Sequence, residues 1–235
     1  MTESVAEVFS PIIIPPTGGK CTASVILLHG SKISGEDLRQ SFKTSLGEEL
    51  AFPHIRVVYP NAPPRPYSKE KGELRRVWFD RPTSGLEGNE DTQSVDAIVT
   101  KLGRLIDEEV KSGIPLDRIV IGGFSMGGTV AMHLGYRVYP QVAGVLVMGN
   151  FLYNDSSVYK ALENKDGKDA RLPPLQMYHA EQDEKVAFNS GKVTFNRLTS
   201  LGVKGQFIAL PNEGHAMNPT MAKSVRDWIV CVLPE

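Results

Sequence analysis

Residues 119–128 read Ile119-Val120-Ile121-Gly122-Gly123-Phe124-Ser125-Met126-Gly127-Gly128, and this stretch decides the fold of the chain. It begins as a short β-branched strand, and apolar residues at helical spacing follow it (Val130, Ala131, Leu134 and Val138). A serine between a strand and a helix needs small neighbours, because the backbone turns sharply there. Gly123 and Gly127 meet this need. The pattern predicts a nucleophile elbow around Ser125, with an ordinary glycine-rich turn as the alternative.

The rest of the chain alternates apolar runs of strand length with longer segments of helical period. We expect strands over residues 24–28, 55–59, 118–121, 142–148, 175–178 and 206–210, and an antiparallel strand near residues 9–14. The clearest helix covers residues 91–112, and others are expected after Gly35, Ser125, Glu184 and Pro219, the last over residues 220–233. This alternation predicts an α/β fold with a mostly parallel, doubly wound sheet flanked by helices.

Length and composition narrow the function classes. A chain of 235 residues without a repeat or a break in composition predicts a single domain over residues 1–235. Its 26 basic and 27 acidic residues give a net charge of -1, so no overall field attracts nucleic acid. Neither a signal peptide nor a membrane-spanning run is apparent, and Cys21 and Cys231 lack metal-ligand spacing. We expect a cytoplasmic protein without stable membrane insertion.

Two segments bear on the shape of the site. Residues 61–90 are rich in proline and read as irregular, but residues 77–80 are too apolar for disorder and are expected to pack, beside the site or in the core. Residues 149–173 are too few for a folded cap domain. We therefore expect an open site. A basic cluster (Arg65, Lys69, Lys71, Arg75 and Arg76) is expected to be a solvated loop face, with contact to an anionic membrane or an acidic protein as the alternative.

A serine nucleophile needs a histidine to take its proton. Reactive groups of a doubly wound sheet gather at the carboxyl ends of its strands, and His215 lies in a short loop after the strand that ends at residue 210. His54 precedes a strand and His133 lies inside a helix, whereas His29 and His179 leave strands and are expected to shape loops. His215 is the predicted base, with a solvated loop histidine as the alternative.

Asp183 is the predicted partner of this histidine. It lies in the loop after the strand over residues 175–178, so the chain order is serine, acid, histidine, as in α/β-hydrolases. Glu181 and Glu184 are alternatives, and either could instead be a charge that favours the start of the next helix. The N–H of Met126 at a helix start and that of Ser31 after Gly30 are the predicted oxyanion donors.

Taken together, these residues resemble the acyl-protein thioesterase and lysophospholipase family of small α/β-hydrolases. The resemblance spans nearly the whole chain, and it is carried by residues 27–30, 59–66, 78–80 and 122–128 and by the Asp183 and His215 loops. Residues 77–81 and 107–114, and Met126 where thioesterases usually have glutamine, are most similar to the lysophospholipase-like branch. The family's early loop commonly reads HGxGD, whereas here Ser31-Lys32-Ile33-Ser34-Gly35 follows His29-Gly30.

This resemblance implies serine hydrolysis of thioesters or oxygen esters, with no metal and no organic cofactor. It implies Ser125, Asp183 and His215 as the triad and Ser31 and Met126 as oxyanion donors. Trp78 looks like the family's apolar residue beside the substrate, with core packing as the alternative. The expected substrates are an acylated protein or a small acyl ester with a short acyl group. A small-molecule carboxylesterase and a hydrolase-fold binding protein with a degraded site are the alternatives, and the oligomeric state is open.

Overall fold

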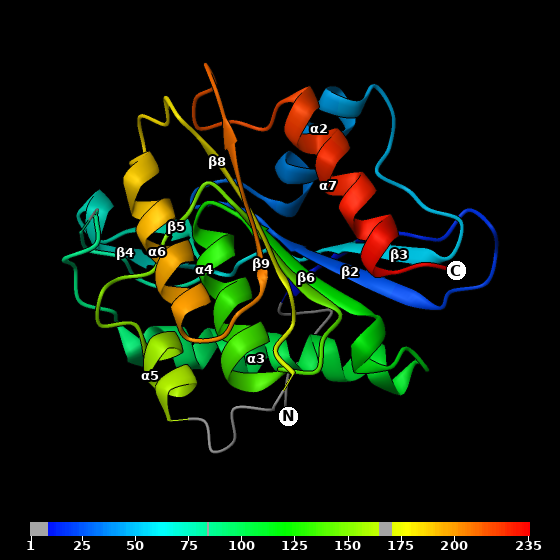
Figure 1. The fold of residues 1–235 in the computed structure, drawn as a ribbon, viewed down its shortest axis with the longest axis horizontal. Coiled ribbons are helices and arrows are strands. Elements are labelled where there is room, and N and C mark those ends of the chain that lie inside the picture. The colour runs from blue at the N-terminus through cyan, green and yellow to red at the C-terminus, as the bar shows by residue number, and fades with distance from the viewer. Residues whose placement is uncertain (1–8, 84, 165–170) are drawn as a thin grey trace.

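A twisted seven-stranded sheet forms the centre of the computed structural model, which describes residues 9–83, 85–164 and 171–235 (Figure 1). β1 pairs antiparallel with β3, and the other neighbouring strands run parallel. The predicted mostly parallel sheet is therefore confirmed, including its antiparallel N-terminal strand. In spatial order the strands are β1 (Ile12–Ile14), β3 (Ile55–Tyr59), β2 (Ala23–Leu28), β6 (Ile119–Phe124), β7 (Gly144–Met148), β8 (Leu175–Ala180) and β9 (Gly205–Leu210).

Helices cover both faces of this sheet (Figure 1). α2 (Gly35–Leu46) and α7 (Pro219–Val232) pack side by side on one face. The other face carries α3 (Thr92–Lys111), α4 (Met126–His133), α5 (Ser157–Glu163) and α6 (Phe188–Ser200). The helices predicted after Gly35, Ser125 and Pro219 are confirmed. The helix predicted directly after Glu184 begins three residues later, at Phe188, because residues 181–187 form the loop that carries Asp183.

Side chains that accept backbone N–H groups start these helices. Ser34 and Asp37 form a capping box at α2, Asp91 accepts the N–H of Ser94 at α3, and Asn218 accepts that of Met221 at α7. Such caps each contribute about 1 kcal/mol. They also fix where the preceding loops end, and those loops leave the carboxyl ends of the strands.

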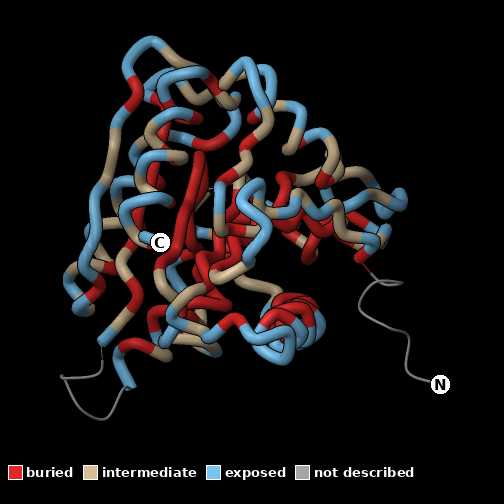
Figure 2. Tube along the Cα trace, turned by 90° about the vertical axis from the view of Figure 1, so that its right-hand side faces the viewer, coloured by how far each residue is buried: buried red, intermediate tan, exposed pale blue. Residues whose placement is uncertain are grey.

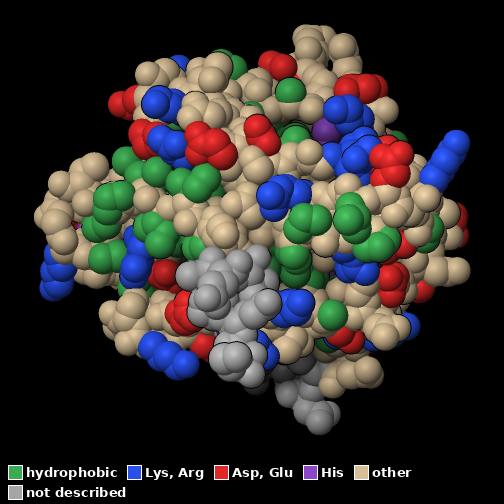
Figure 3. Space-filling model, turned by 180° about the vertical axis from the view of Figure 1, so that it is seen from behind, with side chains coloured by type: hydrophobic (Ala, Val, Ile, Leu, Met, Phe, Trp, Pro, Cys, Tyr) green, Lys and Arg blue, Asp and Glu red, His purple; other side chains and the backbone are tan. Residues whose placement is uncertain are grey.

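Two apolar cores lie on the two faces of the sheet, and Figure 2 shows the buried residues concentrated along the strands and the inner sides of the helices. Leu38 and Phe42 of α2 and Val225 and Ile229 of α7 belong to one core. The other core contains apolar residues at helical spacing in α3 (Val95, Ile98, Val99, Leu102 and Ile106), whereas Val110 near the end of that helix is exposed. At the surface, acidic and basic side chains are interspersed over the face seen in Figure 3, in keeping with the net charge of -1.

The proline-rich region is more ordered than its sequence suggests. β4 (Pro64–Tyr67) and β5 (Glu73–Arg76) form a two-stranded antiparallel hairpin around a 3-10 turn (Ser68–Glu70). Prolines obscured β4, but a two-stranded ribbon tolerates them because the outer edge of each strand needs no N–H donor. Val77, Trp78 and Phe79 are buried, which confirms that this apolar run packs. Within the segment considered for a cap, residues 165–170 lie outside the described residues.

Candidate active site

Ser125 lies at the sharp turn between β6 and α4, with φ 50° and ψ -126°. Non-glycine residues rarely adopt this conformation, which costs about 1–3 kcal/mol. Both flanking glycines are required by close approach: a Cβ on Gly123 would lie 2.2 Å from the carbonyl carbon of Gly127, and one on Gly127 would lie 2.2 Å from the Leu28 oxygen. The N–H of Ser125 donates to the carbonyl of Met148 at 2.8 Å. The turn thus has the geometry of a nucleophile elbow.

Asp183 and His215 come together from the loops after β8 and β9. Asp183 Oδ2 lies 2.7 Å from His215 Nδ1, while Oδ1 accepts the N–H groups of Lys185 at 2.9 Å and Val186 at 2.7 Å. Burial opposes ionisation of Asp183, but the hydrogen bond from His215 and those from the two N–H groups outweigh it, so the pKa of Asp183 lies below its usual value. An ionised carboxylate only accepts hydrogen bonds, and Nδ1 is therefore the donor. In the neutral ring this leaves Nε2 free to accept a proton.

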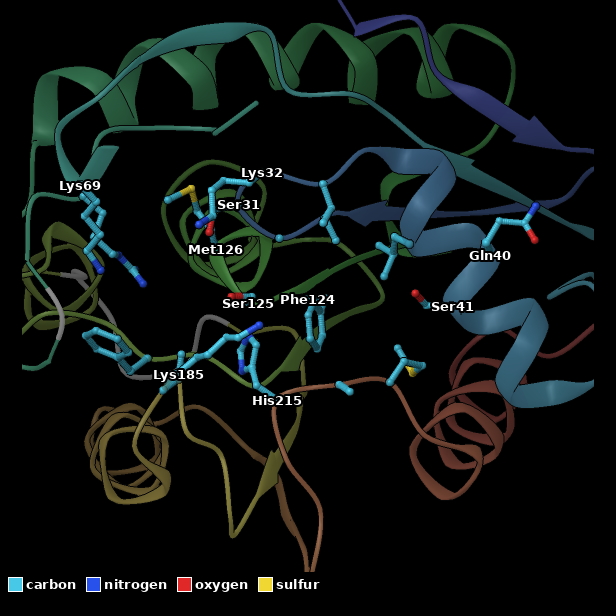
Figure 4. A pocket seen from close by; sticks show the side chains of 18 of the residues that line it. Ser31, Lys32, Gln40, Ser41, Lys69, Phe124, Ser125, Met126, Lys185 and His215 are labelled. Carbon is cyan, nitrogen blue, oxygen red and sulfur yellow. The ribbon is translucent and has the colours of Figure 1, made fainter. Parts of the chain in front are cut away.

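Ser125 and His215 both line a cavity of about 690 Å³ at the carboxyl ends of the strands, where Figure 4 shows them facing the same space. Ser31 and Met126 line it as well. The structure therefore brings four of the six predicted site residues to one cavity, with Asp183 directly behind His215. Glu184, an alternative acid, contacts only the backbone N–H of His215, at 3.3 Å.

His29 fixes the loop that carries Ser31. The ring is buried and its Nε2 accepts the N–H of Ala62 at 2.9 Å, so Nδ1 carries the proton and donates it to the Gly30 carbonyl at 2.6 Å. Burial is the main cause that lowers the pKa of His29 to about 4. The Gly30 carbonyl and the Ser31 N–H belong to one trans peptide and point in opposite directions. Holding that carbonyl against His29 therefore turns the Ser31 N–H away from the ring.

The backbone also places the N–H of Met126, the other predicted oxyanion donor, and brings the loop that carries Ser31 close to Ser125. The N–H of Met126 is the first of α4 and has no acceptor within the helix. A Cβ on Gly30 would lie 3.1 Å from the Cβ of Ser125, so the loop passes close to the serine. No acceptor for the Ser31 N–H occurs in the part of the chain that the structure describes.

The structure buries Trp78 in the core and not along the cavity. Its exposed fraction is 1%, its Nε1–H donates to the carbonyl of His29 at 2.7 Å, and its ring lies 4.8 Å from the His29 ring. Trp78 therefore packs on the core side of the loop that carries Ser31 and stabilises it through His29.

The other histidines also have structural partners. His179 is buried behind Asp183 and lies 2.9 Å from the Val186 carbonyl, and His133 is paired with Glu90 at 3.0 Å inside the protein. Among residues 9–83, 85–164 and 171–235, no group of three or more histidine, cysteine or acidic side chains is arranged to hold a metal ion. Within the same ranges, no helix is long and apolar enough to span a bilayer.

Several residues that line the cavity are not among the site residues predicted from the sequence. Tyr67 and Lys69 come from the proline-rich hairpin, Arg81 follows the buried apolar run, and Phe151 and Lys185 come from the loops after β7 and β8. Arg81 ends the run over residues 77–81 that resembles the lysophospholipase-like branch, and Lys69 belongs to the basic cluster expected to be a solvated loop face, but neither pattern predicts a place in this cavity. Only the folding of the hairpin and the strand-end loops over the sheet brings them together.

Comparison with known proteins agrees with this architecture. A family model described as phospholipase/carboxylesterase matches residues 11–233. The chain is 46% identical over 222 residues to lysophospholipase-like protein 1 of Mus musculus, covering 94% of this chain and 91% of that protein. It is 32% identical over 218 residues to acyl-protein thioesterase 1 homolog 2 of Dictyostelium discoideum, covering 91% and 94%. The crystal structure of acyl-protein thioesterase 2 of Zea mays superposes with a TM-score of 0.80 at 23% identity, covering 95% and 98%. The predicted family resemblance and α/β-hydrolase fold are confirmed.

Proposed function

The chain belongs to the phospholipase/carboxylesterase family and is a hydrolase, and from this premise we propose that it cleaves acyl thioesters or oxygen esters through an acyl-enzyme on Ser125. One observation carries the proposal. The 2.7 Å hydrogen bond from His215 to the ionised Asp183 fixes the tautomer of a histidine that shares a cavity with the elbow serine. This is the arrangement that general-base activation of a serine requires.

The first half of the reaction forms the acyl-enzyme. Ser125 Oγ attacks the acyl carbonyl carbon while His215 Nε2 removes the hydroxyl proton. The carbonyl oxygen becomes an oxyanion that accepts hydrogen bonds from the N–H groups of Met126 and Ser31. The bond to the leaving group then breaks, and the imidazolium of His215 protonates the departing alkoxide, or a thiolate where it needs a proton. Ser125 now carries the acyl group.

Water completes the cycle. His215 removes a proton from a water molecule, whose oxygen attacks the acyl carbon, and the same two N–H groups hold the second oxyanion. Collapse of this intermediate returns the proton to Ser125 Oγ and releases the carboxylic acid. In both halves Asp183 stabilises the imidazolium that forms and keeps the ring oriented.

Short acyl groups are the proposed substrates, carried by a protein, a lipid or a small molecule. One side of the cavity is formed by α2, which contributes Leu38 and the polar side chains of Gln40, Ser41, Thr44 and Ser45. An apolar pocket stabilises each buried CH₂ by about 0.8 kcal/mol, but hydroxyl and amide groups that lose water offset this gain. The polar α2 wall therefore favours short chains over palmitate-length chains. It equally suits small soluble esters, so a carboxylesterase is the second candidate.

A fluorophosphonate probe tests the nucleophile. We expect covalent labelling of the wild-type protein at Ser125 and none of Ser125→Ala. No labelling of the wild type, or equal labelling of both proteins, would show instead a hydrolase fold with a degraded site. Turnover of acetyl, octanoyl and palmitoyl esters and thioesters then separates the two candidates, because a carboxylesterase favours the oxygen esters.

A further inference from the structure

Arg81 is a buried cation beside the proposed nucleophile. Its exposed fraction is 6%, and it lines the same cavity as Ser125. The guanidinium carbon lies 5.2, 4.7 and 5.3 Å from the ring centroids of Phe79, Phe151 and Tyr153. Aromatic faces stabilise a guanidinium but do not neutralise it, and an arginine stays charged in proteins.

The hydrogen bonds of Arg81 leave this charge uncompensated. Its two terminal nitrogens donate to neutral groups, Thr129 Oγ1 at 2.7 Å and Asn150 Oδ1 at 3.3 Å, and its Nε has no partner among the described residues. In the described ranges of the chain no carboxylate forms an ion pair with it. A buried unpaired charge is costly unless a counter-charge joins it. The surroundings of Arg81 therefore favour the binding of an anion.

The carboxylates nearest this side of the cavity have other partners. Asp183 is bonded to His215. Glu90 attracts Arg81 only at longer range, because its carboxylate accepts hydrogen bonds from Ser156 and Ser157 and faces His133. Asp80 accepts two hydrogen bonds from Ser68. A bound molecule is therefore better placed than these side chains to supply the counter-charge of Arg81.

Two lysines extend the positive charge around Arg81. Lys185 enters from the loop after β8, and Figure 4 shows its side chain reaching into the cavity towards Ser125 and His215. It forms no ion pair with the described acidic residues. Lys69 enters from the hairpin. Its pKa is lowered, mainly by burial and to a smaller extent by the positive charges of Arg81 and Lys32. Lys32 itself is paired with Glu70 at 2.9 Å. We call Lys69, Arg81 and Lys185 the cationic arm.

We propose that the cationic arm binds a carboxylate or phosphate on the substrate, so that the protein acts on anionic acyl esters or thioesters. This inference rests on the proposed function. A guanidinium and an ammonium on one wall match the oxygens of such a group. The opposite wall, formed by α2 and Met217, carries no cation among its described lining residues and suits the uncharged end of the substrate. The anionic group belongs either to the acyl chain or to the leaving group.

Two matched pairs of substrates distinguish these sources. The first compares the 4-nitrophenyl monoester of glutarate with 4-nitrophenyl valerate, which differ by a carboxylate on the acyl chain. The second compares butyryl thioesters of 3-mercaptopropionate and of N-acetylcysteamine, which differ by a carboxylate on the leaving group. In one pair we expect kcat/KM of the anionic member to exceed that of the neutral member by roughly tenfold, because a hydrogen bond to a charged group is worth about one power of ten.

The variant Lys185→Gln should reduce this ratio several-fold, and added NaCl should reduce it as well. Lys101→Gln, an exposed change on α3, is the matched control and should keep the ratio. Ratios near one in both pairs, or a ratio that neither Lys185→Gln nor salt changes, would overturn the proposal. Because Lys185 is exposed, its substitution does not endanger the fold.

A binding measurement separates this proposal from the catalytic one. In Ser125→Ala, calorimetry should show that monomethyl glutarate binds and dimethyl glutarate does not, and that Arg81→Met or Lys185→Gln weakens the binding. Such binding without hydrolysis of any of the four substrates would refute the catalytic role and keep the anion site. Hydrolysis of the neutral substrates, with no binding of monomethyl glutarate and with ratios near one in both pairs, would refute the anion site alone.

Discussion

Replacement of Asp183 by asparagine tests the proposed triad most directly, because the structure determines how the new side chain must lie. Two backbone N–H groups point at Oδ1 of Asp183, so the oxygen of the introduced amide has to take this place. The amide NH₂ then faces His215 Nδ1, where Asp183 accepts a hydrogen bond. A donor in this position forces Nδ1 to be the acceptor and moves the proton to Nε2.

The expected loss follows from this exchange. A ring protonated at Nε2 cannot remove the Ser125 proton, and the imidazolium that forms during attack loses its ionised partner. Together these effects raise the barrier by about 5 kcal/mol, which corresponds to a decrease of kcat on the order of 10⁴-fold. The carboxylate hydrogen bonds are partly conserved, so we expect the fold to persist.

The assay is steady-state hydrolysis of a short-chain ester by the wild type, Asp183→Asn and the control Glu184→Gln, with circular dichroism of each. Glu184 is the neighbouring acid that contacts only the backbone of His215, and its glutamine replacement keeps an acceptor oxygen there. We expect the control to lie within about threefold of the wild type. A folded Asp183→Asn that keeps a tenth of the activity, or a larger loss in Glu184→Gln, would refute the assignment of Asp183.

Three further predictions concern the elbow at Ser125 and the two side chains, His29 and Trp78, that hold the loop of Ser31. Gly127→Ala should abolish activity and lower expression of soluble protein, because its Cβ would lie 2.2 Å from the Leu28 oxygen, and an active, stable variant would contradict the required close approach. The folded pKa of His29, about 4, lies below its ordinary value of 6.5, so the unfolded chain binds more protons between these values and stability is lost as the pH falls from 6.5 to 4. This loss should reach about 3 kcal/mol in urea titrations, and it should shrink in His29→Gln. Trp78→Phe removes the hydrogen bond to the buried His29 carbonyl and should lower the free energy of unfolding by about 1–3 kcal/mol. The preference for acyl length should not change, and a changed preference would place Trp78 beside the substrate.

Local patterns account for the parts of the fold that the sequence predicts well. The period of the apolar residues in α3 and the β-branched runs of the central strands are properties of single segments. The bounds of α3 and of the central strands lie within two residues of the expected ones, except that β6 extends three residues further, to Phe124. Ser125, Asp183 and His215 can be proposed from the sequence for the same reason. Each follows a strand, and parallel strands end at one edge of the sheet. Chain order then limits their pairing.

The residues that line the cavity cannot be predicted from the sequence in this way. Arg81 and Lys185 are separated by more than a hundred positions and carry no shared spacing. They meet only because the hairpin and the loop after β8 fold over the same strand ends. The hairpin itself was missed because its prolines argue against a strand, although its second strand, β5, contains none. Such tertiary placement leaves no periodic trace in the sequence.

In the loop after β2, a residue departs from the family pattern and still has the backbone conformation that a glycine would favour. Lys32 stands where the family commonly has a second glycine, and its φ is 70°, in the left-handed region that glycine favours. Its N–H donates to the Arg76 carbonyl at 2.9 Å, so the hairpin holds this strained conformation. Two residues before Lys32, the Gly30 carbonyl accepts a hydrogen bond from His29 Nδ1. The peptide of Ser31 is thus held from both sides, and the proposed oxyanion donor depends on these two contacts more than on the missing glycine.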